Sequence, residues 1–335
     1  MFKKFENEGM PLDKIRRKAF NEFNQAVYHE KIKLNRVSSC FCKAQDFLEL
    51  SKLDRFGLPF GTQICKACGL VTQTLRIDDQ SMPLFYDEMY WPLVLGGKKG
   101  FNTPPKKNEE TPYIIDFIDK KKEKIKIFEI GCGSGNRIDS ISSNLEDRGH
   151  KVEKFGCDYS NEALEIAKNK GIRVVQGGIN EIVQFGTPDL LILSHVVEHF
   201  SDLNTEIEHI RELVDEHSLV YVEVPGIIDL ENKKEYSFDY QMYNVLAHTY
   251  NFSLQTLTNV FSIGGFEIIS GDEFVRAVFK KTSNTQGEYK IVSSFDQTIQ
   301  ALERAYIKRE KYQKKKSLII YRYLKGIIKL ILGRA

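Results

Sequence analysis

An apolar run followed by three alternating glycines occupies residues 125–135, which read IKIFEIGCGSG. The mostly apolar side chains of Ile125–Ile130 predict a buried strand. Gly131, Gly133 and Gly135 follow it directly, and glycine adopts backbone conformations that other residues avoid, so the chain can approach a ligand closely here. A helical pattern comes next, and the free N–H groups at the start of a helix suit a ligand that carries oxygen acceptors.

The same alternation of apolar runs and helical patterns continues to about residue 280. It predicts a parallel sheet with helices on both faces. Two late runs, Phe266–Ser270 and Phe274–Lys280, lie close enough to pair as an antiparallel finish. The other predicted strands are Val152–Cys157, Arg173–Gln176, Leu190–Ser194 and Leu219–Val224, and the predicted helices are Arg137–Leu145, Asn161–Lys170 and Leu203–Val214.

The glycine spacing separates two classes of nucleotide site. The pattern is G-x-G-x-G, whereas the dinucleotide fingerprint G-x-G-x-x-G would need a glycine where Asn136 stands. This spacing opposes a nicotinamide oxidoreductase. Asp158 ends the second predicted strand, and a carboxylate there can accept hydrogen bonds from two adjacent ribose hydroxyls. Ser160 is placed to cap the helix that follows.

With these residues in view, residues 111–280 resemble the class I S-adenosylmethionine (SAM)-dependent methyltransferases. The resemblance rests on residues 128–135, 156–160 and 194–199. It implies a doubly wound, Rossmann-like sheet of seven strands and SAM as the cofactor. A glycine replaces the acid that often follows the third strand of this family, so Asn180 or backbone groups are expected to hold the adenine. The implied cofactor residues are Glu129, Gly131, Gly133, Gly135, Asp158, Tyr159, Asn180 and Ser194.

Three histidines need an interpretation. His195, Glu198 and His199 match the H-x-x-E-H signature of some zinc proteases, but that signature belongs on a helix and here follows a predicted strand. We expect His195 to face cofactor or substrate and His199 to pack at the start of the next helix. His248 precedes a predicted helix, as in the sugar and small-molecule branches of the family. Histidine can take a hydroxyl proton near neutral pH, so His248 is the first candidate for the base and His195 the second. A surface-loop role for His248 stays open.

Four of the six cysteines form two close pairs, Cys40-x-Cys42 and Cys65-x-x-Cys68. Two thiolate pairs at such a spacing predict a tetrahedral Zn²⁺ site, and four cysteine ligands leave no open position, so the zinc would be structural. The alternative is four ordinary buried thiols. The chain starts with no secretory pattern, which together with the paired thiols favours a cytoplasmic location.

The order of these parts suggests an acceptor. A four-Cys module, an aromatic-acidic stretch over 85–91 and then a methyltransferase domain resemble the sugar methyltransferases, including enzymes of surface-glycan assembly. The resemblance implies a carbohydrate-type acceptor, a nucleotide sugar or a surface-glycan intermediate. The sequence departs from the nucleotide-sugar C-methyltransferases because the tail is shorter than their further C-terminal domain, and this departure favours methylation at oxygen. The alternatives are a sugar C-methyltransferase, an RNA methyltransferase and a non-catalytic SAM-binding scaffold. The net charge of +2 argues against nucleic acid as a partner.

We expect four segments along the chain. They are a helical segment over 1–36 with Asp13 near the helix start, the Cys module and linker over 37–100, the methyltransferase domain over 101–283, and a tail over 284–335. Within the tail, Leu318–Leu332 reads as a basic amphipathic helix, too short and too charged to span a membrane. Peripheral contact with the inner membrane surface and docking on protein both stay open for it. The sequence does not indicate the oligomeric state.

Overall fold

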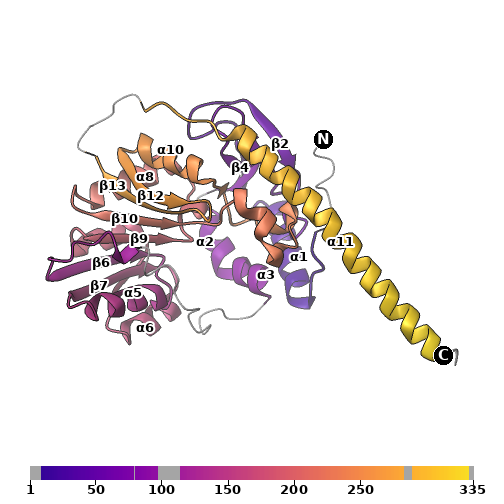
Figure 1. The fold of residues 1–335 in the computed structure, drawn as a ribbon, viewed down its shortest axis with the longest axis horizontal. Helices are drawn as coiled ribbons and strands as arrows, with labels where there is room; N and C mark the ends of the chain where they lie inside the picture. The colour runs from indigo at the N-terminus through magenta and orange to yellow at the C-terminus, as the bar shows by residue number, and fades with distance from the viewer. Residues whose placement is uncertain (1–8, 79, 97–113, 283–288, 332–335) are drawn as a thin grey trace.

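The computed structural model describes residues 9–78, 80–96, 114–282 and 289–331, and at 87, 95 and 318–331 it describes the backbone alone. The linker predicted around 97–105 lies outside the described residues. A large sheet with flanking helices forms one part of the molecule, and the N-terminal elements lie beside it, with helix α11 running across them (Figure 1).

The large sheet has seven strands in the order β12-β13-β10-β9-β6-β7-β8. Strands β8, β7, β6, β9 and β10 are parallel, and β13 pairs antiparallel with both β10 and β12. The predicted doubly wound sheet and its antiparallel finish are therefore confirmed. The strands are β6 (Lys124–Ile130), β7 (Lys151–Asp158), β8 (Arg173–Gln176), β9 (Leu190–Ser194), β10 (Leu219–Glu223), β12 (Phe266–Asp272) and β13 (Arg276–Lys281).

Both faces of this sheet are covered, as the apolar runs require. On one face Ile127 and Ile192 pack with α5 (Asn136–Glu146) and α6 (Asn161–Lys168). On the other, Phe128 and Leu193 pack with α7 (Ile179–Ile182), α8 (Leu203–Leu213) and α10 (Leu254–Ile263). Each fully buried side chain of this size contributes about 1.5–3 kcal/mol through removal of apolar surface from water.

Short polar side chains cap the N-termini of three helices of the domain. The Ser160 hydroxyl accepts a hydrogen bond from the Ala163 N–H at 3.3 Å, which confirms the predicted cap of α6. Asp202 accepts from the Thr205 N–H at the start of α8, and Ser253 accepts from the Thr256 N–H at the start of α10. Each cap satisfies an N–H that the helix leaves free and contributes about 1 kcal/mol.

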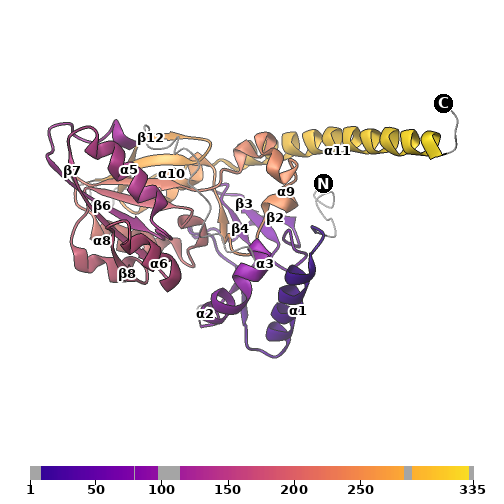
Figure 2. The same cartoon turned by 90° about the horizontal axis from the view of Figure 1, so that it is seen from below.

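The N-terminal region is not a separate body. Strands β2 (Phe47–Ser51), β3 (Thr62–Cys65) and β4 (Val71–Gln73) form a small sheet, and β11 (Tyr250–Asn251), from the middle of the methyltransferase domain, pairs with β4 as its fourth strand. Figure 2 shows this sheet beside the large one. A second pair, β1 (Leu34–Arg36) with β5 (Leu75–Ile77), lies next to α1 (Lys14–Tyr28), which Asp13 caps as predicted.

Helix α11 (Phe295–Ile331) crosses the small sheet and then extends away from the body of the molecule (Figure 1). It packs on the turns η6 (Ile228–Asn232) and η7 (Lys234–Tyr236) and on α9 (Tyr240–Tyr243). The Arg309 guanidinium is buried and pairs with Asp239 at 2.6 Å. Arg309 is therefore not part of a solvent-facing basic surface on this helix.

The apolar and basic faces predicted for 318–332 lie outside the described side chains. Within the described residues, no helix combines the length and apolar character that crossing a membrane requires.

Candidate active site

The turn between β6 and α5 is built from glycine in left-handed conformations. Gly131, Gly133 and Gly135 have φ angles of 65°, 51° and 71°. A side chain at Gly135 would collide with Ile172, whereas a Cβ at Gly133 would meet no atom of the described residues within 4 Å. Gly135 is therefore needed for packing, and the open space at Gly133 leaves its backbone accessible to a ligand.

Asp158 lies at the carboxyl end of β7, next to this turn. Its carboxylate accepts hydrogen bonds from the Gly133 N–H at 2.9 Å and from the Ser160 N–H at 2.8 Å. The predicted ribose-binding acid is thus adjacent to the open glycine. A carboxylate has about four lone-pair directions, so two remain for ligand hydroxyls.

Glu129 stands on β6 just before the turn and is buried. Its carboxylate accepts a hydrogen bond from the Ile138 N–H at 3.2 Å and lies 3.9 Å from Arg137 Nε. Arg137 in turn donates to Glu223 at 2.7 Å. Glu129 therefore holds the first turn of α5 in place, and this contact positions the backbone of the glycine turn.

The remaining predicted cofactor residues lie in three different settings. The Ser194 hydroxyl, at the end of β9, is buried without a hydrogen-bond partner among the described residues. The Tyr159 side chain is 79% exposed. Asn180 is exposed in the first turn of α7 and lines a small pocket with His209 and Glu212 of α8. Ser194 thus presents an unused polar group, whereas Asn180 belongs to a pocket between two helices.

His195 has an unusual backbone and a more than half exposed side chain. Its φ of 55° lies in the region that non-glycine residues rarely adopt, directly after β9. Its Nδ1 is 3.2 Å from Glu198 Oε1, and its side chain is 53% exposed. Desolvation opposes the charged ring, but the hydrogen bond to Glu198 and the charges of Glu198 and Glu223 raise the pKa of His195 overall.

His248 is packed against His199, with ring centroids 5.0 Å apart. Burial, followed by the charge of His199, lowers the pKa of His248 to about 3. A general base works best when its pKa lies near the working pH. The low pKa of His248 therefore argues against His248 as the general base. His195, the second candidate, has the more suitable surroundings.

Glu198 joins these histidines and is 1% exposed. It lies in a short 3-10 turn, η5 (Val197–His199), instead of the helix that the protease signature requires. Burial opposes its charge, yet the hydrogen bond to His195 and the nearby histidines lower the pKa of Glu198. Its second oxygen, Oε2, has no hydrogen-bond partner among the described residues, an arrangement that costs about 1–3 kcal/mol.

An aromatic wall stands beside Glu198. It comes from the helical stretch α2 (Met82–Leu84), η2 (Phe85–Tyr90) and α3 (Trp91–Leu95). The rings of Tyr86 and Tyr90 are 5.0 Å apart, and burial, with a further contribution from the charge of Glu198, raises the pKa of both hydroxyls. The sequence identified this stretch only as aromatic and acidic, because its placement near enough to Glu198 for the two to interact electrostatically depends on how the N-terminal region folds onto the large sheet.

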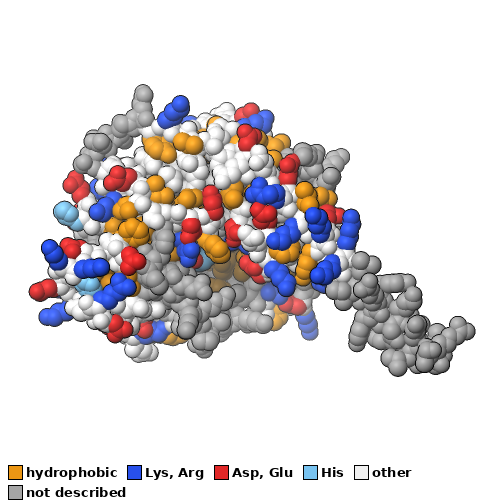
Figure 3. All heavy atoms as spheres, viewed as in Figure 1, with side chains coloured by type: hydrophobic (Ala, Val, Ile, Leu, Met, Phe, Trp, Pro, Cys, Tyr) orange, Lys and Arg blue, Asp and Glu red, His pale blue; other side chains and the backbone are white. Residues whose placement is uncertain are grey.

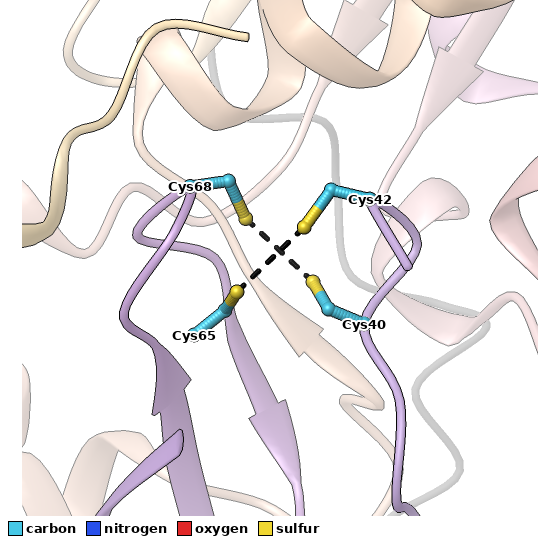
Figure 4. Close-up of side chains that lie close together, drawn as sticks. All are labelled: Cys40, Cys42, Cys65 and Cys68. Carbon is cyan, nitrogen blue, oxygen red and sulfur yellow. Dashed lines mark hydrogen bonds between the residues drawn. The ribbon is translucent and has the colours of Figure 1, made fainter. Parts of the chain in front are cut away.

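The four paired cysteines converge on one point, as Figure 4 shows. The Cys40 and Cys68 sulfurs are 3.6 Å apart, and those of Cys42 and Cys65 are 3.7 Å apart. All four sulfurs lie within 4.8 Å of one another. A tetrahedron with Zn–S bonds of about 2.3 Å has edges of about 3.8 Å, so the cluster fits zinc. The Ser294 N–H, just before α11, donates to the Cys68 carbonyl, which links the cluster to the C-terminal helix.

Residues 109–271 match a family model described as a methyltransferase domain. The mouse protein named "Probable tRNA methyltransferase 9B" is 30% identical over 103 residues, which are 30% of this chain and 21% of that protein. The "tRNA N(3)-methylcytidine methyltransferase trm140" of Schizosaccharomyces pombe is 26% identical over 107 residues, 31% of this chain and 34% of that protein. A SAM-dependent methyltransferase structure from Clostridium acetobutylicum has a TM-score of 0.41 at 11% identity and covers 60% of this chain and 100% of that one.

The seven-stranded sheet, the glycine turn and the family match together identify a SAM-dependent methyltransferase domain in this chain. The chain spans about a fifth to a third of the length of the curated relatives that it matches. The residues of the turn fit SAM, because Gly133 leaves room for a ligand and Asp158, which accepts a hydrogen bond from the Gly133 N–H, can also accept from ribose hydroxyls. The named relatives lend no support to the resemblance to sugar methyltransferases.

We predict that Gly133→Ala weakens SAM binding at least tenfold while the fold persists. The added methyl group meets no protein atom but occupies the open space, and the left-handed backbone costs only about 1 kcal/mol. Isothermal titration calorimetry measures the affinity. Gly149→Ala is the matched control, since Gly149 has a φ of 93° and equally open surroundings away from the site. Equal SAM affinity in the two variants would contradict the placement of the cofactor.

For the cysteine cluster, we predict one zinc ion per chain by native mass spectrometry and its loss in Cys65→Ser. Thermal unfolding of this variant should begin at a lower temperature, since structural zinc contributes directly to folding. Cys157→Ala removes a buried thiol outside the cluster and should keep the zinc. A wild-type chain free of zinc after expression in zinc-containing medium would rule out the site.

Proposed function

We propose that this chain transfers the methyl group of SAM to a nucleotide of RNA. The observation that carries the methyl-transfer part is the open, left-handed glycine turn joined to Asp158 by the Gly133 N–H. When bound there, SAM supplies an already activated methyl group, so the protein mainly supplies proximity and alignment.

On the cofactor side of the site, different residues would hold different parts of SAM. The backbone of Gly131, Gly133 and Gly135 would hold the methionine end, and the two free lone-pair directions of Asp158 would accept the ribose hydroxyls. Glu129 positions this turn through the N-terminus of α5. The Ser194 hydroxyl, at the end of β9 and without a partner among the described residues, is a further polar group that a ligand could engage.

On the acceptor side, His195 would take the proton that the acceptor loses. Its ring is exposed, and Glu198 fixes its orientation through Nδ1. Its Nε2 lies 3.9 Å from Glu223 Oε1 and is the nitrogen that would meet the acceptor. The strained backbone at His195 is consistent with a residue held for function, since such strain persists only where the surroundings enforce it.

Two observations support RNA over the other acceptors. Tyr86 and Tyr90 stand beside Glu198, and aromatic side chains stack on unpaired bases in RNA recognition. The two curated relatives named above are both tRNA methyltransferases by name. The expectation that nucleic acid is not a partner rested on the net charge of the whole chain, which does not describe the surface around the site.

A carbohydrate-type acceptor is the second candidate. Acidic and basic side chains are intermixed on the face of the molecule in Figure 3, without the broad basic surface that phosphate backbones attract. The four-cysteine cluster packs into the core of the methyltransferase domain through Cys65 and Cys68, so a zinc ion bound there would have a structural role with either acceptor.

We predict that the full-length chain transfers label from methyl-labelled SAM to total tRNA and that His195→Asn lowers the rate about a hundredfold or more. His217→Asn, in the exposed loop before β10 at the opposite edge of the parallel strands from the glycine turn, is the matched control and should keep the rate. Nucleotide sugars and glycolipid fractions are tested in parallel. If a sugar fraction becomes labelled and tRNA does not, the carbohydrate proposal replaces the RNA proposal.

A further inference from the structure

Two histidines and one carboxylate converge just beyond β9, and the methyl-transfer account leaves much of their chemistry unused. They are Glu198, His199 and His248, and one ligand atom from each lies within 4.8 Å of the other two. The three residues come from η5 and from the loop before β11, so the domain brings them together from distant parts of the chain.

The hydrogen bonds of the group leave at least one ligand atom available on each of its three members. His199 Nδ1 lies 2.8 Å from the Ala247 carbonyl and donates to it, which leaves Nε2 as the atom with the free lone pair. That Nε2 faces Glu198 Oε1 at 3.9 Å. A lone pair and a carboxylate oxygen repel each other unless a proton or a metal cation lies between them. Fixing one imidazole nitrogen by a backbone carbonyl is also the usual support of a metal-bound histidine.

The other two members carry buried atoms without a partner. Glu198 Oε2 and His248 Nδ1 make no hydrogen bond within the part of the chain that the structure describes. Glu198 is 1% exposed, so water does not readily replace the missing partner. Buried polar atoms are rarely left unpaired, and two of them in one group point to a missing ligand.

We propose that Glu198, His199 and His248 bind a divalent transition-metal cation. Two imidazoles and one carboxylate leave coordination positions open, as in metal sites that also bind a substrate. Ligand atoms bonded at about 2.1 Å are about 3.4 Å apart in a tetrahedral arrangement, so the side chains close slightly on the ion. His195, whose Nδ1 contacts the same carboxylate, stands next to the open positions.

The position of this cation suggests that it activates the acceptor, and this role rests on the proposed methyl transfer. An acceptor oxygen on an open coordination position would lie beside His195, and a cation there would favour loss of the oxygen's proton. The aromatic wall of Tyr86 and Tyr90 would then hold the rest of the acceptor. The binding of the cation itself does not depend on which acceptor is used.

Mn²⁺ is the probe, because it prefers nitrogen and oxygen ligands and competes poorly for the four-Cys cluster. The zinc-loaded, full-length chain is titrated with Mn²⁺, and the loss of the free-ion electron paramagnetic resonance signal is measured. We expect one bound Mn²⁺ per chain and an affinity at least tenfold lower in Glu198→Gln and in His248→Asn. His217→Asn, which changes an exposed histidine before β10 and outside the group, should bind as the wild type does.

Circular dichroism of each variant verifies that it is folded, so that lost binding is not mistaken for lost structure. Absence of a bound Mn²⁺ in the wild type, or equal affinity in the wild type, Glu198→Gln and His248→Asn, would overturn the cation site. If Mn²⁺ binding depends on Glu198 and His248 but the labelled-SAM assay leaves tRNA without label, the cation site stands and only the RNA acceptor is contradicted.

Discussion

The hydrogen bond from the Gly133 N–H to the Asp158 carboxylate joins the two loops on which the rest of the site depends. It can form only because the glycines after β6 adopt left-handed conformations that turn the chain back toward the end of β7. The same turn begins α5, and the buried Glu129 carboxylate caps that helix. One constraint on backbone conformation thus fixes a helix start, an open stretch of backbone and a carboxylate beside it.

The acceptor side depends on contacts between distant segments. β11, which follows His248 closely, is a strand of the small N-terminal sheet, and this pairing holds the loop that carries His248 against η5. The cysteine cluster lies in the same apolar core as β6 and β9, and it contacts the start of α11. Zinc binding would therefore stabilise the acceptor side without touching the acceptor.

Local patterns in the sequence predicted the features that depend on neighbouring residues. The strands from β6 to β10, the glycine turn and the Ser160 cap follow from apolar periodicity and short-range hydrogen bonding. The H-x-x-E-H pattern pointed to zinc-protease chemistry, which was rejected because the segment follows a strand. The meeting of Glu198 with His248 depends on the long-range pairing of β11 with β4, which no local pattern reveals. The buried pair of Arg309 with Asp239 was missed for the same reason.

The central claim is that the glycine turn binds SAM and not a nicotinamide dinucleotide. The most direct measurement is isothermal titration calorimetry of the full-length chain with SAM and, separately, with NADH. The account predicts saturable binding of one SAM per chain and no heat of binding for NADH, because Asn136 stands where a dinucleotide site would have glycine. Saturable binding of NADH together with no binding of SAM would contradict it.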